Sequence, residues 1–461
     1  MANHKHTSRR KFIKGAALLG ASGVLANPDL RGQNIALKQP KAKNLIFLVS
    51  DGMSMGTLSL AQHWKLMNKE QPLEWIQLLS RPDVVHALQQ TNSYDSPVTD
   101  SAAAASAWGG GELVNNGVIN ISPSGDFNEP IFVQAKKANK SIGLVSTSRI
   151  THATPAGFLA NAVSRDDEDA IAEQYLKRNL DVCLGGGLRH FKNNERDLIP
   201  AFLDKGHAIC RDLKDLKNLT PRDQKVLGLF TDSHFPYRID RDRLKGNSRL
   251  PTLETLLEVA LEQLAANPDG FVLSVEAARV DHAGHDNDAA AILHEQLEFD
   301  RCIRIALNFL ESNPDTLVIV TTDHGCGGCQ LNAHASGYAE TRHALERLKH
   351  FTVSLEEIAA KAISDGSLDK VYFEKSTGIN VSQAKVRSFD AKINAGIQYP
   401  AGTLADHFSE EFIKATAIGW TSHQHTAEHV DLAAIGAGSS LIPNYLRNYE
   451  LNGIMRSALE I

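Results

Sequence analysis

Three short apolar segments each run directly into an acidic residue, and this feature constrains the fold of the chain more than any other. The segments Asn44–Ser50, Phe271–Val275 and Leu317–Thr322 precede Asp51, Glu276 and Asp323. Short continuous apolar runs of this kind are typical of strands buried on both faces of a parallel sheet. Because such strands end at a common edge, where open α/β sheets bind their ligands, we expect the three carboxylates to converge.

The rest of the chain alternates similar runs with helical patterns. Further strands are predicted at Ser141–Ser146, Asp181–Leu184 and Asp431–Ile435, and helices at Thr57–Asn68, Ala289–Glu311 and Asn452–Leu459. A helix is also expected from about Asp166 to Leu180. The alternation favours an α/β fold with a central, mostly parallel sheet. Residues from about 190 to 250 and from about 327 to 420 lack this order, and we interpret them as insertions near the sheet edge and the site.

Composition narrows the classes of partner. The chain has 461 residues, 42% of them hydrophobic, which is enough for a large core. Its net charge is −6, and without residues 1–26, which hold five basic and no acidic residues, it is 43 minus 54, or −11. This argues against nucleic acid as a partner. It contains 19 histidines, many of them beside Asp or Glu, and this raises the expectation of bound metal.

The N-terminus has the pattern of an export signal. The basic segment Ser8–Lys14, SRRKFIK, is followed by the short apolar run Gly15–Ala26. The run is too short to span a bilayer, and the order of segments matches a twin-arginine signal better than a soluble basic tail. We therefore expect a signal peptide over residues 1–26, a linker over 27–43, no stable membrane span, and a periplasmic or secreted protein.

Val98–Ala107, VTDSAAAASA, predicts a helix that begins near Ser101. Free backbone N–H groups and the helix dipole favour anions there, so the Ser101 hydroxyl could act as a nucleophile if another group lowered its pKa. The alternative is that Asp100 or Ser101 serves only as an N-cap.

Other candidate residues are ambiguous when taken singly. Asp51 could cap a turn, Arg165 could be a solvated surface residue, and the Asp323–His324 pair could belong to a hydrogen-bonded loop. Asp281 and His285 are four apart and share a helix face, a spacing that can chelate zinc. If these groups converge with Ser101 and Arg165, two zinc ions could clamp a phosphoryl group.

Five cysteines are present, and an odd number excludes a complete set of intrachain disulfides. Cys326 and Cys329 form a C-x-x-C motif. Without a second cysteine pair it is a weak zinc-ribbon signal, and we favour a local disulfide or free thiols.

Six motifs in order resemble the alkaline phosphatase family. They are SDGMSMG from Ser50, VTDSAAAASAW from Val98, HATPAGFLANAVSR from His152, VEAARVDHAGH from Val275, TTDHG from Thr321 and HQHT from His423. The resemblance extends from about Asn44 to the C-terminus. It implies a three-layer α/β/α fold and a catalytic domain over residues 44–461.

The resemblance also implies a role for each site residue. Ser101 would be the nucleophile that becomes phosphoserine, and Arg165 would hold the phosphate. The metal ligands would be divided among two Zn²⁺ sites and one Mg²⁺ site: Asp281, His285 and His425; Asp51, Asp323 and His324; and Asp51, Thr154 and Glu276. His152 and His282, which vary within the family, would act on magnesium or phosphate through water.

The function implied is hydrolysis of small phosphate monoesters, with a homodimer compatible with the assignment. A sulfatase would need a C/S-x-P-x-R context, which Ser101-Ala102-Ala103 lacks, and a diesterase of this superfamily usually has a Thr nucleophile. A non-catalytic protein that binds phosphate or metal would be expected to have lost the nucleophile or a ligand.

Overall fold

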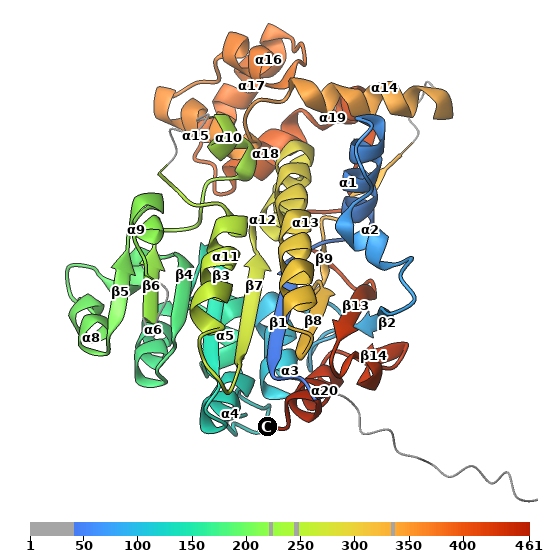
Figure 1. The fold of residues 1–461 in the computed structure, drawn as a ribbon. Helices are drawn as coiled ribbons and strands as arrows, with labels where there is room; N and C mark the ends of the chain where they lie inside the picture. Colours follow the sequence, from blue (N-terminus) through green and yellow to red (C-terminus); the bar gives the residue numbers. More distant parts are fainter. Residues whose placement is uncertain (1–40, 221–224, 244–248, 333–336) are drawn as a thin grey trace, which may run out of the picture. The chain divides into compact units, whose positions relative to one another are not determined.

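A large β-sheet forms the centre of the computed structural model, which describes residues 41–220, 225–243, 249–332 and 337–461 (Figure 1). In the described part of the chain this sheet has ten strands. In spatial order they are β14 (Tyr445–Arg447), β2 (Val85–Gln90), β13 (Val430–Gly436), β8 (Thr316–Thr321), β1 (Asn44–Ser50), β7 (Phe271–Ala277), β3 (Ser141–Arg149), β4 (Val182–Gly186), β6 (Lys225–Leu229) and β5 (His207–Cys210).

The sheet is mostly parallel, as the sequence predicts. The seven consecutive strands from β8 to β5 pair in parallel, whereas β13 runs antiparallel to both β8 and β2. Four short strands form two small ladders outside the sheet. They are β9 (Gly325–Cys326) with β12 (His425–Thr426), and β10 (Gln330–Leu331) with β11 (Ile418–Gly419).

Helices cover both faces of the sheet, so the architecture has three layers (Figure 1). Along β1, Ile46 and Leu48 belong to one hydrophobic core, and Leu45 and Phe47 belong to the other. Because successive side chains of a strand point to opposite faces, one buried strand supplies both cores.

The helices divide between these two cores. Those on the first are α1 (Met55–Met67), α2 (Glu74–Leu78), α9 (Leu213–Lys217), α10 (Arg238–Arg243), α11 (Leu253–Leu264), α12 (Arg279–His285) and α13 (Ala289–Ser312). Those on the second are α3 (Ser101–Gly110), α4 (Ile131–Lys137), α5 (Ala153–Leu159), α6 (Glu168–Lys177), α7 (Leu188–Phe191), α8 (Ile199–Asp204) and α20 (Glu450–Leu459).

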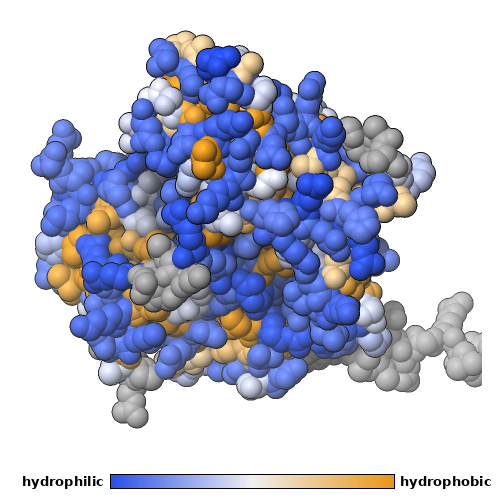
Figure 2. All heavy atoms as spheres, turned by 90° about the horizontal axis from the view of Figure 1, so that it is seen from above, coloured by the Kyte–Doolittle hydropathy of each residue, from blue (hydrophilic) through white to orange (hydrophobic). Residues whose placement is uncertain are grey.

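A helical cap is formed by α14 (Thr341–Glu346), α15 (Leu355–Asp365), α16 (Lys370–Thr377), α17 (Gln383–Asn394), α18 (Pro400–His407) and α19 (Ser409–Thr416). It lies at the top of Figure 1, and Figure 2 shows that the face seen from above is mostly hydrophilic. Leu355, Ile358 and Phe408 of the cap belong to the same core as α13. The Leu355 N–H also donates to the Asp288 carboxylate at 2.6 Å, so the cap is continuous with the sheet layers.

The helix that carries Ser101 is buried on almost every side. Asp100 is its N-cap, with its carboxylate accepting from the Ala103 N–H at 2.9 Å, and Ser101 is its first residue. A Cβ at Gly109 would lie 1.9 Å from the Gly157 carbonyl oxygen of α5. The small residues of α3 therefore allow two backbones to pack directly against each other, and this packing fixes the N-terminus of α3.

The strands predicted from the sequence all form, with ends shifted by a few residues. Four sheet strands were not predicted, because β2 is only half buried and β5, β6 and β14 are short. The segment interpreted as an insertion at 190–250 supplies β5 and β6 to the sheet itself. The predicted signal peptide, and the linker apart from residues 41–43, lie outside the described residues. Among those described, no helix is both long and apolar enough to cross a bilayer.

Candidate active site

Three neighbouring strands bring acidic side chains to one edge of the sheet. Asp51 follows the end of β1, Glu276 is the penultimate residue of β7, and Asp323 follows β8 by two residues. Val49 of β1 pairs with both Glu276 and Thr321, so the carboxyl ends of these strands are level. The convergence expected from the sequence is observed.

A first cluster, which we call the outer cluster, consists of Asp281, His285 and His425. The Nε2 atoms of the two imidazoles are 3.0 Å apart, and they lie 3.3 and 3.4 Å from the Asp281 carboxylate oxygens. Asp281 and His285 lie one turn apart on α12, as their spacing predicts, whereas His425 comes from β12.

Hydrogen bonds at the far side of each ring place a hydrogen on Nδ1 and fix the orientation of the ring. His425 Nδ1 is 2.8 Å from the Thr99 carbonyl oxygen, and His285 Nδ1 contacts the His423 carbonyl oxygen. A carbonyl only accepts, so each Nδ1 carries a hydrogen and each ring turns its Nε2, the nitrogen available to a metal, towards Asp281. Ring orientation of this kind is usual for metal-binding histidines.

The second cluster, the inner cluster, consists of Asp51, Asp323 and His324. His324 Nε2 lies 3.1 Å from Asp323 Oδ2 and 3.7 Å from Asp51 Oδ1. The other oxygen of Asp323 accepts from the N–H groups of Gly52 and His324, both at 3.0 Å. Gly52 has φ +69°, and a Cβ there would lie 2.6 Å from Asp281, so a glycine is needed at this turn.

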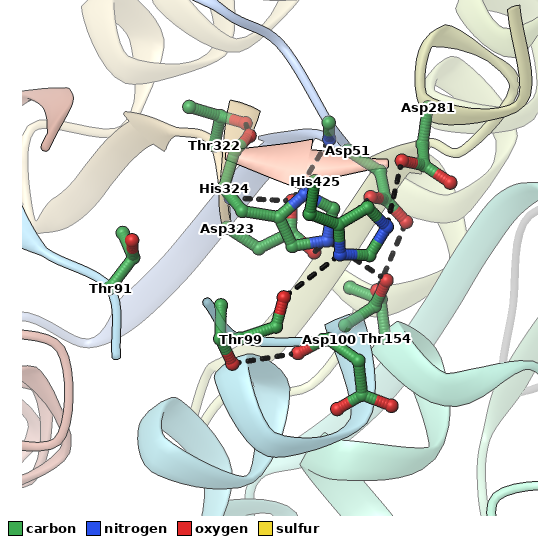
Figure 3. Close-up of polar contacts among 12 residues, drawn as sticks. Asp51, Thr91, Thr99, Asp100, Thr154, Asp281, Thr322, Asp323, His324 and His425 are labelled. Atoms are coloured by element: carbon green, nitrogen blue, oxygen red, sulfur yellow. Dashed lines mark hydrogen bonds and ion pairs between the residues drawn. The ribbon is translucent and has the colours of Figure 1, made fainter. Parts of the chain in front are cut away.

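The two clusters are adjacent. The rings of His324 and His425 stack with their centroids 3.6 Å apart, and Figure 3 shows them between the carboxylates of Asp51, Asp281 and Asp323. Thr154 of α5 reaches the same place, with its hydroxyl 3.4 Å from Asp51 Oδ2. Glu276 completes the group and accepts from the Ser146 hydroxyl of β3.

The four buried carboxylates of Asp51, Glu276, Asp281 and Asp323 lie close together and require positive charge to balance them. Burial, and then the charges of Asp323, Asp281 and Glu276, raise the pKa of Asp51 well above its ordinary value, and burial raises the pKa of Glu276 to about 7. One oxygen from each of Asp51, Glu276, Asp281 and Asp323 is buried without a hydrogen-bond partner among the described residues. Buried carboxylates are costly unless they are paired or bind metal, and carboxylate–imidazole sets suit zinc. The residues present therefore fit metal ions.

Ser101 lies beside the inner cluster. Its hydroxyl oxygen is 3.2 Å from His324 Nε2, and its side chain is buried at the N-terminus of α3. Of the two residues that could be the N-cap, Asp100 is the one that caps this helix. The Ser101 hydroxyl is therefore not used as a cap and faces the clusters.

Arg165 is held next to Ser101. Its guanidinium donates to Asp100 Oδ2 at 2.9 Å and to His152 Nε2 at 3.2 Å. Burial lowers the pKa of Arg165, but the charges of Asp100 and the site carboxylates outweigh this and raise it. The side chain is 21% exposed, so one part of the cation remains accessible from outside.

His152 and His282 belong to a group of three imidazoles, of which sequence reasoning missed the third, His234. The ring centroids are 4.4 Å apart for His234 and His282, and 5.5 Å apart for His234 and His152. Burial, with the positive charges nearby, lowers the pKa of all three. His234 lies in the segment interpreted as an insertion, and no motif marks it.

The structure thus brings all the predicted site residues to one place and adds two others. Cys326 of β9 lies within the outer cluster, and His234 lies beside His152. All five cysteines are free thiols, so of the alternatives for the C-x-x-C motif the structure has the unlinked pair.

An acidic, histidine-rich pocket at the edge of a parallel sheet, beside a serine at a helix N-terminus, is typical of metal-dependent hydrolases. A family model described as alkaline phosphatase matches residues 42–461. The chain belongs to the alkaline phosphatase family and is a phosphatase.

Individual relatives agree with this assignment. Alkaline phosphatase 3 of Bacillus subtilis is 32% identical over 433 residues, which covers 92% of this chain and 90% of that protein. The repressible alkaline phosphatase of Saccharomyces cerevisiae is 32% identical, over 89% of this chain and 79% of its own length. The structure of Thermus thermophilus alkaline phosphatase superposes with a TM-score of 0.84 at 33% identity, covering 95% of this chain and 96% of that one.

Proposed function

We propose that this phosphatase is an exported phosphomonoesterase that transfers the phosphoryl group to Ser101 and then releases inorganic phosphate. The observation that carries the proposal is the cluster of buried imidazole and carboxylate ligand atoms in the pocket. Four buried carboxylates and the Nε2 atoms of His285 and His425 face one another in the pocket. The Nδ1 atom of each ring already contacts a backbone carbonyl oxygen, and one oxygen of each carboxylate has no hydrogen-bond partner among the described residues. Only cations satisfy such a set, and Ser101 lies against it.

The proposed metal complement is two Zn²⁺ and one Mg²⁺. The outer cluster would hold one zinc, and the inner cluster would hold the other. Asp51, Thr154 and Glu276 offer oxygen atoms only, which suits magnesium. His152 and His282 each accept from an arginine, Arg165 and Arg279, and would contact the site through these neighbours and water rather than bind a metal directly.

The protein residues would then carry the reaction as follows. Ser101 Oγ attacks phosphorus, an Oγ–P bond forms, and the P–O bond to the alcohol breaks. Arg165, held by Asp100, pairs with two phosphoryl oxygens through its planar fork, and the N-terminus of α3 adds N–H dipoles. When bound, the metal ions supply positive charge that favours serine alkoxide and stabilises the transition state. Water then cleaves the phosphoserine.

The mouth of the site favours broad specificity. A cleft of about 620 Å³ leads outward from His285 and is lined by both acidic and basic side chains, among them Arg279, Glu356 and Asp406. The proposed contacts are made with the phosphoryl group, so the alcohol part of the substrate would contribute little to binding.

The activity is tested by comparing three substrates at equal metal loading. We expect p-nitrophenyl phosphate to be hydrolysed with a kcat/KM far above those of bis-p-nitrophenyl phosphate and p-nitrophenyl sulfate. A preference for the diester or the sulfate would replace the proposal with another enzyme of the same superfamily. No turnover with metal bound would leave a binding protein.

We also propose the route and the organisation of the chain. A twin-arginine signal at residues 1–26 would export the folded, metal-loaded protein to the periplasm or the medium, and the catalytic domain of residues 44–461 would act there, as a homodimer if it self-associates. Replacing Arg9 and Arg10 by Lys tests the route. The mass of the exported protein should correspond to a chain that begins near Asn27. The variant should remain in the cytoplasm at full length. Equal export of the wild type and the variant would contradict this route. Light scattering of the exported protein tests the homodimer.

A further inference from the structure

Cys326 lies in the site without a role in the proposed reaction. It is the second residue of β9 and pairs directly with His425 of β12 in an antiparallel ladder. Directly opposed residues of such a ladder point to the same side. The Cys326 thiol therefore lies on the side of the ladder from which His425 reaches the outer cluster.

The distances place the sulfur among the outer-cluster atoms. One ligand-type atom from each of Asp281, His285, Cys326 and His425 lies within 4.8 Å of the other three. Cys326 is fully buried, and only a glycine makes room for it. A Cβ at Gly284 of α12 would lie 2.9 Å from the Cys326 Cβ and 3.1 Å from its Sγ. The thiol thus packs against the turn of α12 that carries Asp281 and His285.

A second observation points to a ligand at this position. Asp281 Oδ1 is buried and has no hydrogen-bond partner among the described residues, although its own cluster surrounds it. The Nε2 atoms of His285 and His425 lie 3.3 and 3.4 Å from the oxygens of the same carboxylate. Two imidazoles, a carboxylate and a sulfur are a donor set that zinc prefers to the harder cations.

We propose that Cys326 is a fourth protein ligand of the metal ion at the outer cluster. This inference rests on the proposed function, since it requires that Asp281, His285 and His425 hold a metal. The thiol releases its proton to solvent when the metal binds, because a coordinating sulfur is a thiolate. Zinc in catalytic sites sometimes expands to five ligands, so four protein ligands would still leave a position for a phosphate oxygen.

The test is the absorption spectrum of the full chain, stripped of metal with a chelator and then titrated with Co²⁺ alone. Thiolate bound to Co²⁺ gives a near-ultraviolet charge-transfer band, which imidazole and carboxylate do not give. We expect the band in the wild type and in Cys329→Ser, a matched control from the same motif. Cys329 is buried against α1, with its carbonyl oxygen beside Gly56. Cys326→Ser should bind as many cobalt ions without the band, and its zinc affinity should fall by about tenfold or more.

The other possible results would contradict either the role of Cys326 or the metal site itself. Cobalt bound by the wild type without the band, or a band that persists in Cys326→Ser, removes Cys326 from the ligand set and leaves the metal site standing. A wild type that binds no cobalt removes the outer metal site and this inference with it. Should Cys326→Ser not fold, X-ray absorption of the zinc-loaded wild type decides, since a sulfur ligand scatters at about 2.3 Å from zinc. A spectrum with nitrogen and oxygen scatterers alone would exclude Cys326.

Discussion

The Ser101 hydroxyl lies where a helix N-terminus, an arginine and the inner cluster meet. Its distance of 3.2 Å to His324 Nε2, and the pairing of Arg165 with the adjacent Asp100, give it the surroundings that the proposed nucleophile requires. Because Asp100 already caps α3, the fold does not need the Ser101 hydroxyl for stability.

Ser101→Ala should therefore separate chemistry from metal binding. We expect kcat for p-nitrophenyl phosphate to fall by at least about a thousandfold, as for loss of a nucleophile elsewhere. Metal content per chain, measured by mass spectrometry, should be unchanged. Ser106→Ala is the control on the same helix. It removes the hydrogen bond from the Asn120 N–H and the one to the Val118 carbonyl oxygen, both away from the site, and should keep its turnover. Loss of metal together with activity in Ser101→Ala would give the serine a structural role.

Metal binding at the outer cluster should depend on pH. The charge of Asp281 raises the pKa of His285 to about 9 in the metal-free protein. The imidazole is thus protonated below this pH, and a metal must displace that proton to bind. We expect the apparent zinc affinity to fall by about tenfold for each pH unit below 9, where one proton is displaced. Zinc titration of the stripped protein between pH 6 and 9 measures the slope, and an affinity independent of pH in this range would contradict it.

The same pKa predicts the stability of the metal-free chain. His285 has a folded pKa above the ordinary value of 6.5, so its contribution to stability is complete below pH 6.5 and is lost as the pH rises through 9. Zinc replaces the proton in this role. The loaded protein should therefore lose less stability over this interval than the stripped protein, as urea unfolding at both pH values would show.

At the scale of elements, the site depends on the direct contact of α3 with α5. Both helices carry site residues, since Ser101 begins α3, while α5 contains Thr154 and is preceded by its N-cap His152. The small side chains of α3, together with Gly157, let the two backbones approach closely. Their separation sets the distance between the nucleophile and the Asp51–Thr154 pair.

Gly109→Ala should disturb this contact. The new Cβ would meet the Gly157 carbonyl oxygen at 1.9 Å, so the helices must separate. Overpacking of this kind costs about 2 kcal/mol of unfolding free energy, and the shift of α3 should also lower kcat. Gly453→Ala in α20 is the control, because its Cβ meets nothing within 4 Å and should change stability by no more than about 1 kcal/mol, in the favourable direction. Similar unfolding midpoints for the two variants would mean that α3 and α5 adjust freely.

The sequence predicts those elements whose residue pattern is distinctive within the element itself. β1, β7 and β8 are continuous apolar runs with an acid at or just beyond the end, so both the strands and the carboxylates can be placed from sequence. The remaining ligands were assigned by resemblance. Asp281 and His285 also have a local signal in their spacing, but nothing near His425 shows that β12 will carry it to α12.

What the sequence does not predict depends on pairings between distant segments. Cys326 enters the site because β9 pairs with β12 and because Gly284 leaves room for it. His234 follows β6, a strand that the charged composition of its segment conceals. The antiparallel direction of β13 is also set by tertiary pairing, since its apolar run reads the same way in either direction.

At the scale of the whole molecule, the site is the point at which distant parts of the chain meet. Pro40–Ile461 forms one compact unit, in which the sheet, the helical layers and the cap share buried side chains. The proposed metal ligands come from both the N-terminal and C-terminal parts of this unit, because Asp51 follows β1 and His425 lies in β12. Four carboxylates are buried where these parts join, and their mutual repulsion opposes the fold unless cations neutralise it.

Removal of metal should therefore destabilise the entire unit and not only stop turnover. A ligand that binds only the folded state stabilises it by mass action, so EDTA should lower the melting temperature by about 5–10 °C while it abolishes activity. Zinc added back should restore most of the melting temperature, because two of the three ligand sets contain imidazole, and magnesium added with zinc should restore full activity. Magnesium alone should restore little of either. Calorimetry and phosphatase rates on the same samples measure both effects, and a chain whose melting temperature and activity ignore the chelator would show that protons, not metals, neutralise these carboxylates.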